Sequence, residues 1–229
     1  MDGLYTNSKK GFFKYPDSTR VHRNLPKTKL YEQANADSKL KEMFVTQVEQ
    51  IIWAQKLSAQ TLNIEAHKDV TEIQVFEIKL KGEQLNTEVL QAIDKAIPHP
   101  IIFEVKTTTK KQYVTACYKA IGVNGGVSLS EYYQSELSLG EENLARFELP
   151  VALNTKGLYE QLLASLFPYD LRENESFTEL IHRLDEIKSL AKKQQQVNKK
   201  LSNEKQFKNK VIINAELKQI KQQLKQLTA

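Results

Sequence analysis

VTEIQVFEIKLKGEQLNTEVLQAIDKAIPHPIIFEVKT, residues 70–107, carries the clearest structural pattern in the chain. Residues 70–80 are rich in β-branched and aromatic residues and are apolar on both alternating faces, which predicts a central strand. Apolar residues at helical spacing follow at 89–97, where Pro98 stops the pattern. Residues 101–107 again have the pattern of a strand. A strand, a helix and a strand in so short a span predict a right-handed parallel crossover.

The pattern continues with further strands and a helix on the C-terminal side. Residues 113–121 predict an antiparallel partner of the second strand, and a further strand is expected at 131–137. Between them, VNGGVS at 123–128 predicts a mobile loop. Residues 155–167 have apolar positions at helical spacing, and Pro168 ends that helix.

The N-terminal side is less regular. Apolar residues follow helical spacing from Asp37, a candidate cap, to about Leu57, which predicts one helix. Residues 1–35 are rich in Lys, Pro and turn-forming residues and show no sustained period, so a short strand or an extended, irregular N-terminal arm is expected. The globular part is therefore expected to span residues 1–170.

The last part of the chain is predicted to be helical. A Ser-x-x-Glu capping box at Ser176 opens a stretch that lacks both Gly and Pro up to residue 229. A heptad seam, in which apolar residues alternate at spacings of four and three, is formed by Ile213, Leu217, Ile220, Leu224 and Leu227. Because these side chains must be covered, we expect them to contact a partner helix or the preceding helix of the same chain. The weaker pattern at 194–210 leaves open whether residues 175–228 form a hairpin or one long rod.

These patterns together predict an α+β fold. We expect a small mixed β-sheet with flanking helices, followed by a basic C-terminal helical hairpin or coiled coil. A coiled coil leaves a homodimer open as one further interpretation.

The composition is that of a soluble protein. No apolar run approaches the roughly 20 residues needed to span a bilayer, so no membrane contact is expected. The N-terminus lacks the apolar segment and cleavage site of a secretory signal. The single cysteine, Cys117, excludes an intrachain disulfide and a zinc site built from cysteines. These features predict a cytoplasmic protein.

Positive charge is concentrated at the C-terminal end. Residues 188–229 contain 11 Lys and two acidic residues, a net charge of +9, whereas residues 1–187 carry a net charge of −4. A dense basic segment on a mildly acidic body is typical of proteins with an anionic partner, such as DNA, RNA or an acidic protein surface. The candidate contact residues for nucleic acid or a partner are Lys199, Lys200, Lys205, Phe207, Lys208 and Lys210.

Two Glu-x-Lys pairs lie in predicted strands and suggest a catalytic alternative. A metal-dependent nuclease needs two carboxylates on a divalent ion such as Mg²⁺ and a lysine near the activated water. The two candidate sets are Asp94 with Glu104 and Lys106, and Asp69 with Glu77 and Lys79. Glu-x-Lys occurs four times in the chain. This number is close to the number expected by chance in a chain with this content of Glu and Lys. The competing interpretation is that these charges only occupy the less buried positions of each strand.

Four segments resemble one bacterial family of unknown function, DUF4391, in the same order over nearly the whole chain. They read LPKTKLYE at 25–32, IDKAIPHPIIFEV at 93–105, LPVALNTKGLYEQLLASLFP at 149–168 and EKQFKNKVIINAELKQIK at 204–221. The resemblance implies an accessory protein encoded beside a helicase and a DNA methyltransferase in restriction-like phage-defence loci. The family pattern does not require Lys106 and typically has Asn-Arg at the positions of Lys208 and Asn209.

The sequence therefore favours a non-enzymatic accessory subunit over the nuclease. We expect it to need no cofactor and to engage a helicase-like partner, and nucleic acid, through its basic C-terminal helices.

Overall fold

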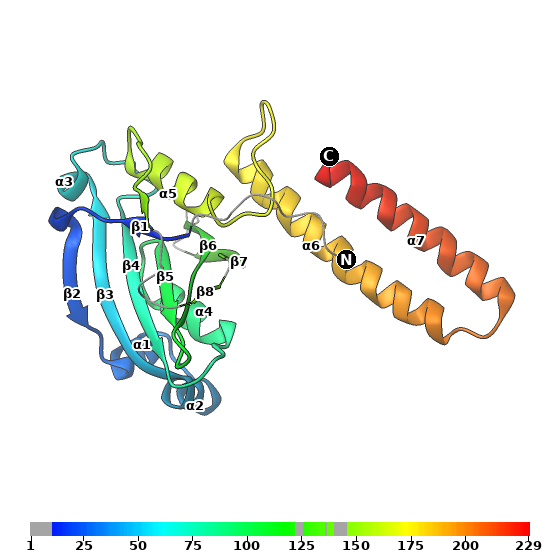
Figure 1. Ribbon diagram of the computed structural model, residues 1–229, viewed down its shortest axis with the longest axis horizontal. Coiled ribbons are helices and arrows are strands. Elements are labelled where there is room, and N and C mark those ends of the chain that lie inside the picture. The colour runs from blue at the N-terminus through cyan, green and yellow to red at the C-terminus, as the bar shows by residue number, and fades with distance from the viewer. Residues whose placement is uncertain (1–10, 122–125, 136, 140–145) are drawn as a thin grey trace. The chain divides into compact units, whose positions relative to one another are not determined.

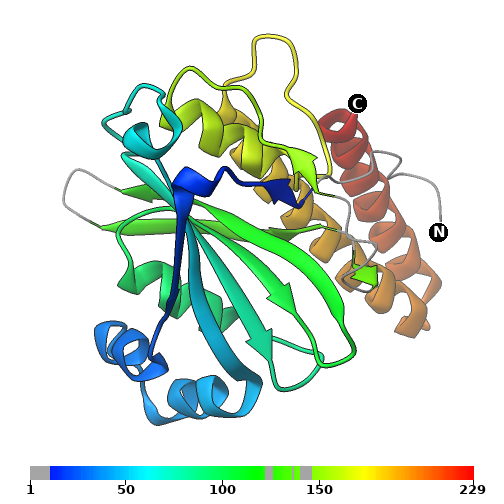
Figure 2. The ribbon, with the colours of Figure 1, turned by 60° about the vertical axis from the view of Figure 1, so that its left-hand side comes forward.

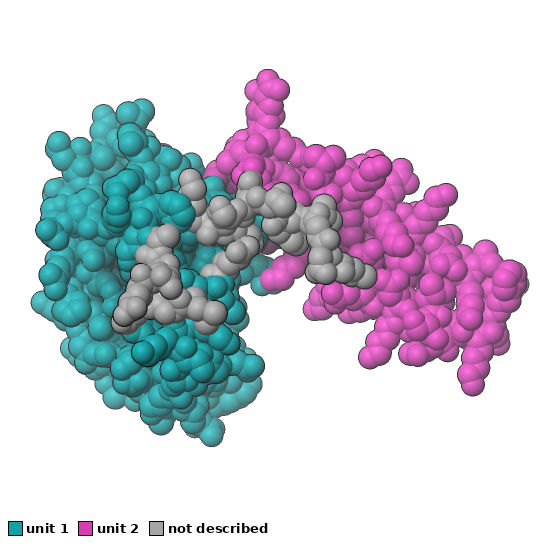
Figure 3. Space-filling view, viewed as in Figure 1, with its two compact units in different colours: residues 1–168 teal, residues 169–229 magenta. Residues whose placement is uncertain are grey.

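The computed structural model describes residues 11–121, 126–135, 137–139 and 146–229. The chain divides into two compact units, unit 1 (residues 1–168) and unit 2 (residues 169–229), which are coloured separately in Figure 3. Unit 1 contains a β-sheet with packed helices, and unit 2 contains two long helices (Figure 1). The predicted α+β class with C-terminal helices is confirmed. No helix within the described ranges is both long enough and apolar enough to cross a bilayer.

Unit 1 is organised around a mixed sheet with the strand order β2-β3-β4-β5-β6-β7, in which β8 also pairs with β6. The strands are β2 (Arg20–Asn24), β3 (Val48–Ser58), β4 (Glu72–Leu80), β5 (Ile101–Lys106), β6 (Lys111–Ile121), β7 (Val127–Gln134) and β8 (Ser138–Leu139). β4 and β5 are parallel and are joined by helix α4 (Thr87–Ala96), whereas the other neighbouring pairs are antiparallel. The predicted strand, helix and strand are therefore confirmed. So is the antiparallel pairing of β5 with β6.

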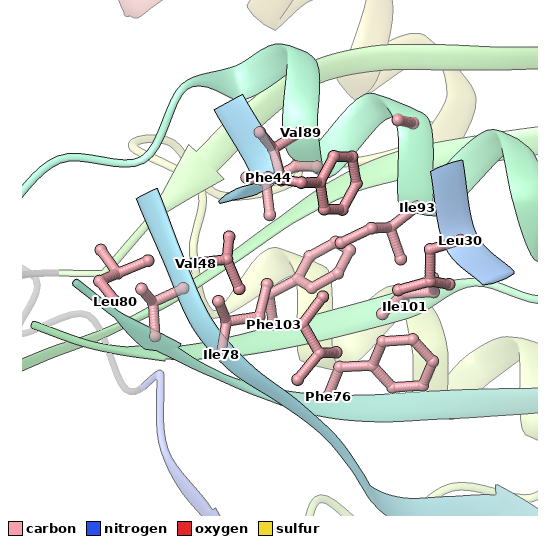
Figure 4. Packing of buried hydrophobic residues seen from close by; sticks show 14 of the residues in the cluster. Leu30, Phe44, Val48, Phe76, Ile78, Leu80, Val89, Ile93, Ile101 and Phe103 are labelled. Carbon is pink, nitrogen blue, oxygen red and sulfur yellow. The ribbon is translucent and has the colours of Figure 1, made fainter. Parts of the chain in front are cut away.

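Three helices pack on one face of the sheet, namely α1 (Lys27–Gln33), α2 (Ser38–Gln47) and α4 (Figure 2). The main hydrophobic cluster lies between them and the strands (Figure 4). Phe44 of α2, Ile93 of α4 and Phe103 of β5 are fully buried there. Each such side chain contributes about 1.5–3 kcal/mol by leaving water. Because strand residues alternate between faces, the neighbours of Phe103 project to the opposite face.

Several short elements complete unit 1. They are β1 (Phe13–Lys14), which pairs in parallel with β9 (Phe147–Glu148), the 3₁₀ helix η1 (Asp17–Thr19), α3 (Ala59–Leu62) and α5 (Thr155–Ala164). α5 confirms the helix predicted from residue 155. The Tyr159 hydroxyl of α5 donates to the Cys117 carbonyl oxygen at 2.9 Å and accepts from the Lys119 amide at 3.0 Å. These two bonds satisfy backbone groups at an irregularity in β6, between Cys117 and Lys119.

The helix predicted from Asp37 to about Leu57 is correct only in its first half. Asp37 caps α2 as expected, since its side chain accepts from the Leu40 amide at 2.8 Å, but residues 48–58 form β3. The buried apolar residues of β3 are spaced by three, as on a helix, and are Val48, Ile51, Ala54 and Leu57. The spacing arises because the ladder shifts between Val48 and Gln50 and again between Trp53 and Gln55, and each bulge displaces the alternation by one residue.

The N-terminal segment was expected to be a short strand or an irregular arm, and from residue 11 onward it forms β1, η1, β2 and α1. The strand is therefore confirmed and the irregular arm is corrected. α1 has too few turns to show a period and is stabilised by tertiary packing. Leu30 is buried, and the Tyr31 ring meets the Phe44 ring edge-on at 5.7 Å. The predicted strand at 131–137 corresponds to β7, which begins earlier and ends at Gln134. Of the predicted mobile loop, residues 123–125 lie outside the described residues, and Val127 and Ser128 already belong to β7.

Unit 2 is a helical hairpin, which resolves the choice left open by the sequence. Ser176 forms the predicted capping box with Glu179 at the start of α6 (Phe177–Asn203), and α7 (Phe207–Thr228) returns along it. The turn between the helices is fixed by Glu204. Its carboxylate accepts from the amides of Lys205 and Gln206, both at 2.8 Å.

Candidate functional site

The two Glu-x-Lys pairs lie side by side on one face of the sheet. In the parallel ladder between β4 and β5, Glu77 is the register partner of Glu104, and Lys79 is the register partner of Lys106. Register partners on neighbouring strands lie roughly 4.8 Å apart. The alternate residues of both strands enter the hydrophobic cluster on the helix-covered face, so the four charged side chains share the opposite face.

A pocket of about 400 Å³ opens over these four side chains. Its lining residues come from β3, β4, β5 and β6, together with Arg146, and include Gln50, Glu77, Lys79, Glu104, Lys106 and Gln112. An adjoining pocket of about 320 Å³ shares Glu77, Glu104 and Arg146 and extends to Tyr15. Both predicted Glu-x-Lys pairs therefore contribute to one polar site.

Arg146 holds Glu104 through both carboxylate oxygens. Its Nη1 donates to Oε1 at 3.0 Å and its Nη2 donates to Oε2 at 2.6 Å, and Nη1 also donates to the Phe13 carbonyl oxygen at 2.9 Å. Glu104 is only 7% exposed. Burial raises the pKa of Glu104 above its usual value, and the Glu77 charge adds to this, whereas Arg146 opposes it. The Glu104 carboxylate is thus a paired, buried group.

Two further polar groups lie at this site. The Gln112 Nε2 has no hydrogen-bond partner among the described residues, and the buried Tyr15 hydroxyl lies beside the Glu104 carboxylate. Burial, reinforced by the Glu104 charge, raises the pKa of Tyr15. No local sequence pattern singles out Tyr15, Gln112 or Arg146 as site residues. Arg146 is 42 residues from Glu104, and no local pattern links two such positions.

The aspartates predicted to complete the two nuclease sets lie elsewhere. Asp94 is on α4, on the helix-covered face, where its carboxylate accepts from the Tyr132 hydroxyl at 2.5 Å and lies 3.6 Å from the Lys119 Nζ. Asp69 precedes β4 and pairs with Lys156 at 3.8 Å. Neither predicted set is assembled as such. Asp94 is separated from Glu104 because α4 covers the face of the sheet opposite to Glu104, and Asp69 is separated from Glu77 because it lies before the start of β4 whereas Glu77 lies in the second half of the strand.

The carboxylates that do meet, Glu77 and Glu104, are a limited donor set for Mg²⁺. Across the described ranges, no cluster of three or more His, Cys, Asp or Glu side chains is placed to hold a metal ion. Mg²⁺ prefers oxygen ligands and usually takes one or two carboxylates together with water or substrate phosphates. Here the Glu104 oxygens are already occupied by Arg146, so Glu77 is the carboxylate that remains for an ion.

The heptad seam of α7 is covered within the chain. Leu217 and Ile220 are buried against Val197 of α6, and other residues packed on this cluster are Leu190, Leu201, Ile213 and Leu224. For the seam Ile213, Leu217, Ile220, Leu224 and Leu227, the sequence left a partner helix and the preceding helix open, and the structure has the first four of these residues packed on the preceding helix. α6 provides this cover, because the turn at 204–206 brings the two apolar faces together.

The turn end of the hairpin presents a different surface, which we call the hairpin tip. It comprises the predicted contact residues Lys199, Lys200, Lys205, Phe207, Lys208 and Lys210, together with Val211 and Ile212. All of these side chains are exposed, and Phe207, Val211 and Ile212 are 81%, 53% and 62% exposed. Val211 follows Phe207 by one helical turn, so the two lie on the same side of α7. The hairpin tip thus combines an apolar strip with lysines and lies outside the apolar cluster between the two helices.

One family model matches most of the chain. The model of a domain of unknown function, DUF4391, matches residues 13–224, which include elements of both units. No match was found among curated proteins or among solved structures.

Proposed function

The chain belongs to the DUF4391 family, a domain of unknown function, and we propose that it is a non-enzymatic accessory subunit whose hairpin tip binds a macromolecular partner. The partner is a helicase-like protein or the nucleic acid that such a protein handles. The family resemblance adds a setting for this proposal, a restriction-like phage-defence system that also includes a DNA methyltransferase.

The supporting observation is the exposure of three large apolar side chains within a lysine-rich surface. Burying Phe207, Val211 and Ile212 against a partner gains hydrophobic free energy that the isolated hairpin does not use. The surrounding lysines favour a partner that offers negative charge. An acidic protein groove satisfies both requirements. A nucleic acid satisfies them through its phosphates and through base stacking on Phe207.

The test uses the full chain with two matched triple variants of α7 and its turn. In the tip variant, Lys205, Lys208 and Lys210 become Glu; in the control variant, the exposed Lys218, Lys221 and Lys225 become Glu. Both variants change the net charge equally. Binding is measured to labelled single- and double-stranded DNA and RNA across a salt series, and in a pull-down with any helicase-like protein that the neighbouring genes encode.

We expect the tip variant to lose binding by tenfold or more while the control variant retains it. Salt-sensitive binding to nucleic acid identifies the phosphate backbone as the contact. If the chain retains the helicase-like protein in a pull-down from which nucleic acid has been removed, the contact is between proteins. Equal loss in both variants, or no binding by the wild-type chain, would reject the proposed role of the hairpin tip.

A second candidate function is a Mg²⁺-dependent nuclease on the open sheet face. The observation that favours it is the register of Glu77 with Glu104 and of Lys79 with Lys106 under one pocket. Arg146 weighs against it, because a guanidinium bound to both Glu104 oxygens competes with a metal ion. The test is cleavage of labelled DNA and RNA with Mg²⁺, Mn²⁺ or EDTA. Activity that persists in both Glu77→Ala and Glu104→Ala would remove this candidate.

A further inference from the structure

Helix α7 has two apolar faces, and the hairpin uses only one of them. Its seam packs on α6. A second set of apolar residues, Phe207, Val211 and Ala215, recurs at a spacing of four, and all three are exposed. Val211 lies about 200° around the helix axis from Ile213 of the seam, so this set is on the opposite side of α7. We call these three residues, with the neighbouring exposed Ile212, the outer strip.

The spacing of the outer strip fits a helix of another protein. Side chains four residues apart form a ridge on a helix surface, and such ridges pack into the grooves of a second helix. From Phe207 to Ala215 the ridge runs about 12 Å, or roughly two turns. A nucleic acid can stack a base on Phe207, but Val211 and Ile212 have no ring for a base to stack on. The outer strip therefore favours a protein helix over a nucleic acid.

The charges around the outer strip determine which kind of helix fits. Five lysines lie on α7, all exposed: Lys208, Lys210, Lys218, Lys221 and Lys225. Glu216 is the one acidic residue of this helix, and it already pairs with Lys193 of α6 at 3.3 Å. A second copy of this chain would bring its own lysines against these, which like-charge repulsion disfavours. A helix that carries carboxylates instead complements them.

We propose that the outer strip binds an acidic amphipathic helix of a partner protein. The apolar residues of that helix pack on Phe207, Val211 and Ala215, and its carboxylates lie beside Lys208 and Lys210. Such a helix belongs to the protein partner of the function proposed above, on which this inference rests. In one contact it covers the exposed aliphatic side chains and neutralises the surrounding lysines.

Overlapping synthetic peptides of about 30 residues, long enough for about eight helical turns, serve as the probe. They cover the proteins that the neighbouring genes encode. Binding of each labelled peptide to the full chain is followed by fluorescence anisotropy, and helix formation by circular dichroism.

Two double variants are compared with wild type. The strip variant carries Val211→Ser and Ile212→Ser, and α7 should stay helical because Ser, Val and Ile have similar helix propensities. The matched control carries Val151→Ser and Leu153→Ser, which lie in unit 1 and are 92% and 85% exposed. Both variants thus remove two exposed aliphatic side chains.

We expect the peptides that bind to be acidic and to become helical on binding. Their affinity should fall about tenfold or more in the strip variant and stay unchanged in the matched control. It should also fall as the salt concentration rises. In the charge-reversed tip variant described above, a peptide with lysines in place of its acidic residues should bind better than the original peptide.

Absence of any binding peptide, binding peptides that are neither acidic nor helical, or equal losses in the two double variants would overturn the acidic helix. So would a wild-type dimer in sedimentation that the strip variant loses, because a second copy would then occupy the outer strip. Nucleic-acid binding that the tip variant loses and the strip variant keeps would uphold the function proposed for the hairpin tip and reject the acidic helix.

Discussion

Glu77 and Glu104 are register partners on parallel strands, yet only Glu104 is held by an arginine. The difference arises from burial. Glu104 is 7% exposed, and a buried carboxylate is costly unless it is paired with a cation and hydrogen-bonded. A bidentate guanidinium meets that need with two hydrogen bonds of good geometry. Arg146 therefore has a structural role at the centre of the sheet face that carries both Glu-x-Lys pairs.

Replacing Arg146 with Met should destabilise unit 1 by about 3 kcal/mol, because it leaves the Glu104 carboxylate buried without its cation. The loss should shrink as the pH falls and Glu104 becomes protonated. Denaturant unfolding followed by Trp53 fluorescence measures this, since Trp53 lies in β3 of unit 1. The control is Lys14→Met, which breaks the exposed pair of Lys14 with Glu148 and should cost under about 1 kcal/mol. Equal losses in the two variants would contradict the role of Arg146.

Asp94 should make unit 1 less stable as the pH rises from about 4 to 6. Burial raises the pKa of its carboxyl from 3.8 to about 6, although Lys119 and Tyr132 oppose this shift. In that window the unfolded chain ionises while the folded chain keeps its proton, so the free energy of unfolding falls with rising pH, by up to about 3 kcal/mol. Asp94→Asn should flatten this part of the profile, measured by Trp53 fluorescence at a series of pH values. A variant profile parallel to that of wild type would contradict the assignment.

Mutations in the hairpin core should lower the stability of unit 2 far more than mutations in the hairpin tip. Ile220→Ala should lower the stability of unit 2 by about 2–4 kcal/mol, because Ile220 is buried between α6 and α7. Phe207→Ser should change it by less than about 0.5 kcal/mol, because Phe207 is 81% exposed. Thermal unfolding followed by circular dichroism at 222 nm compares the two. A large loss in Phe207→Ser would mean that the hairpin tip is part of the folding core rather than a free contact surface.

Local sequence patterns correctly predicted the helices and strands whose conformation is set by neighbouring residues. They failed where contacts with residues distant in the sequence determine the conformation. The β-branched residues of β4 and β5 and the apolar spacing of α4 were sufficient for the strand, helix and strand. β3 was misread because two bulges give its buried residues a helical spacing. Asp94 follows Leu90 by one helical turn, so its burial on α4 could have been inferred and its place in a nuclease set rejected.

The seam of α7 is a second case in which the local sequence predicted only part of the structure. Its heptad spacing correctly indicated a covered apolar face, but the identity of the cover depended on the turn fixed by Glu204. Similarly, the register that aligns Glu77 with Glu104 arises from strand pairing, which the sequence predicted only as a parallel neighbour relationship. Residue types thus suggested candidate groups, whereas pairing between strands and helices determined which groups meet.

Arg172 should hold the last turn of α7 in place. Its Nη2 donates to the carbonyl oxygens of Gln226 at 2.9 Å and Leu227 at 2.7 Å, which have no partner within the helix. A cation at this end also opposes the partial negative charge of the helix C-terminus. In Arg172→Met, we expect amide hydrogen exchange to accelerate several-fold for residues 224–228 and to stay unchanged around Leu217. Lys221→Met is the control, since this exposed lysine also lies on α7 but precedes its last turn. Equal acceleration in both variants would show that general charge, rather than the Arg172 hydrogen bonds, stabilises this end.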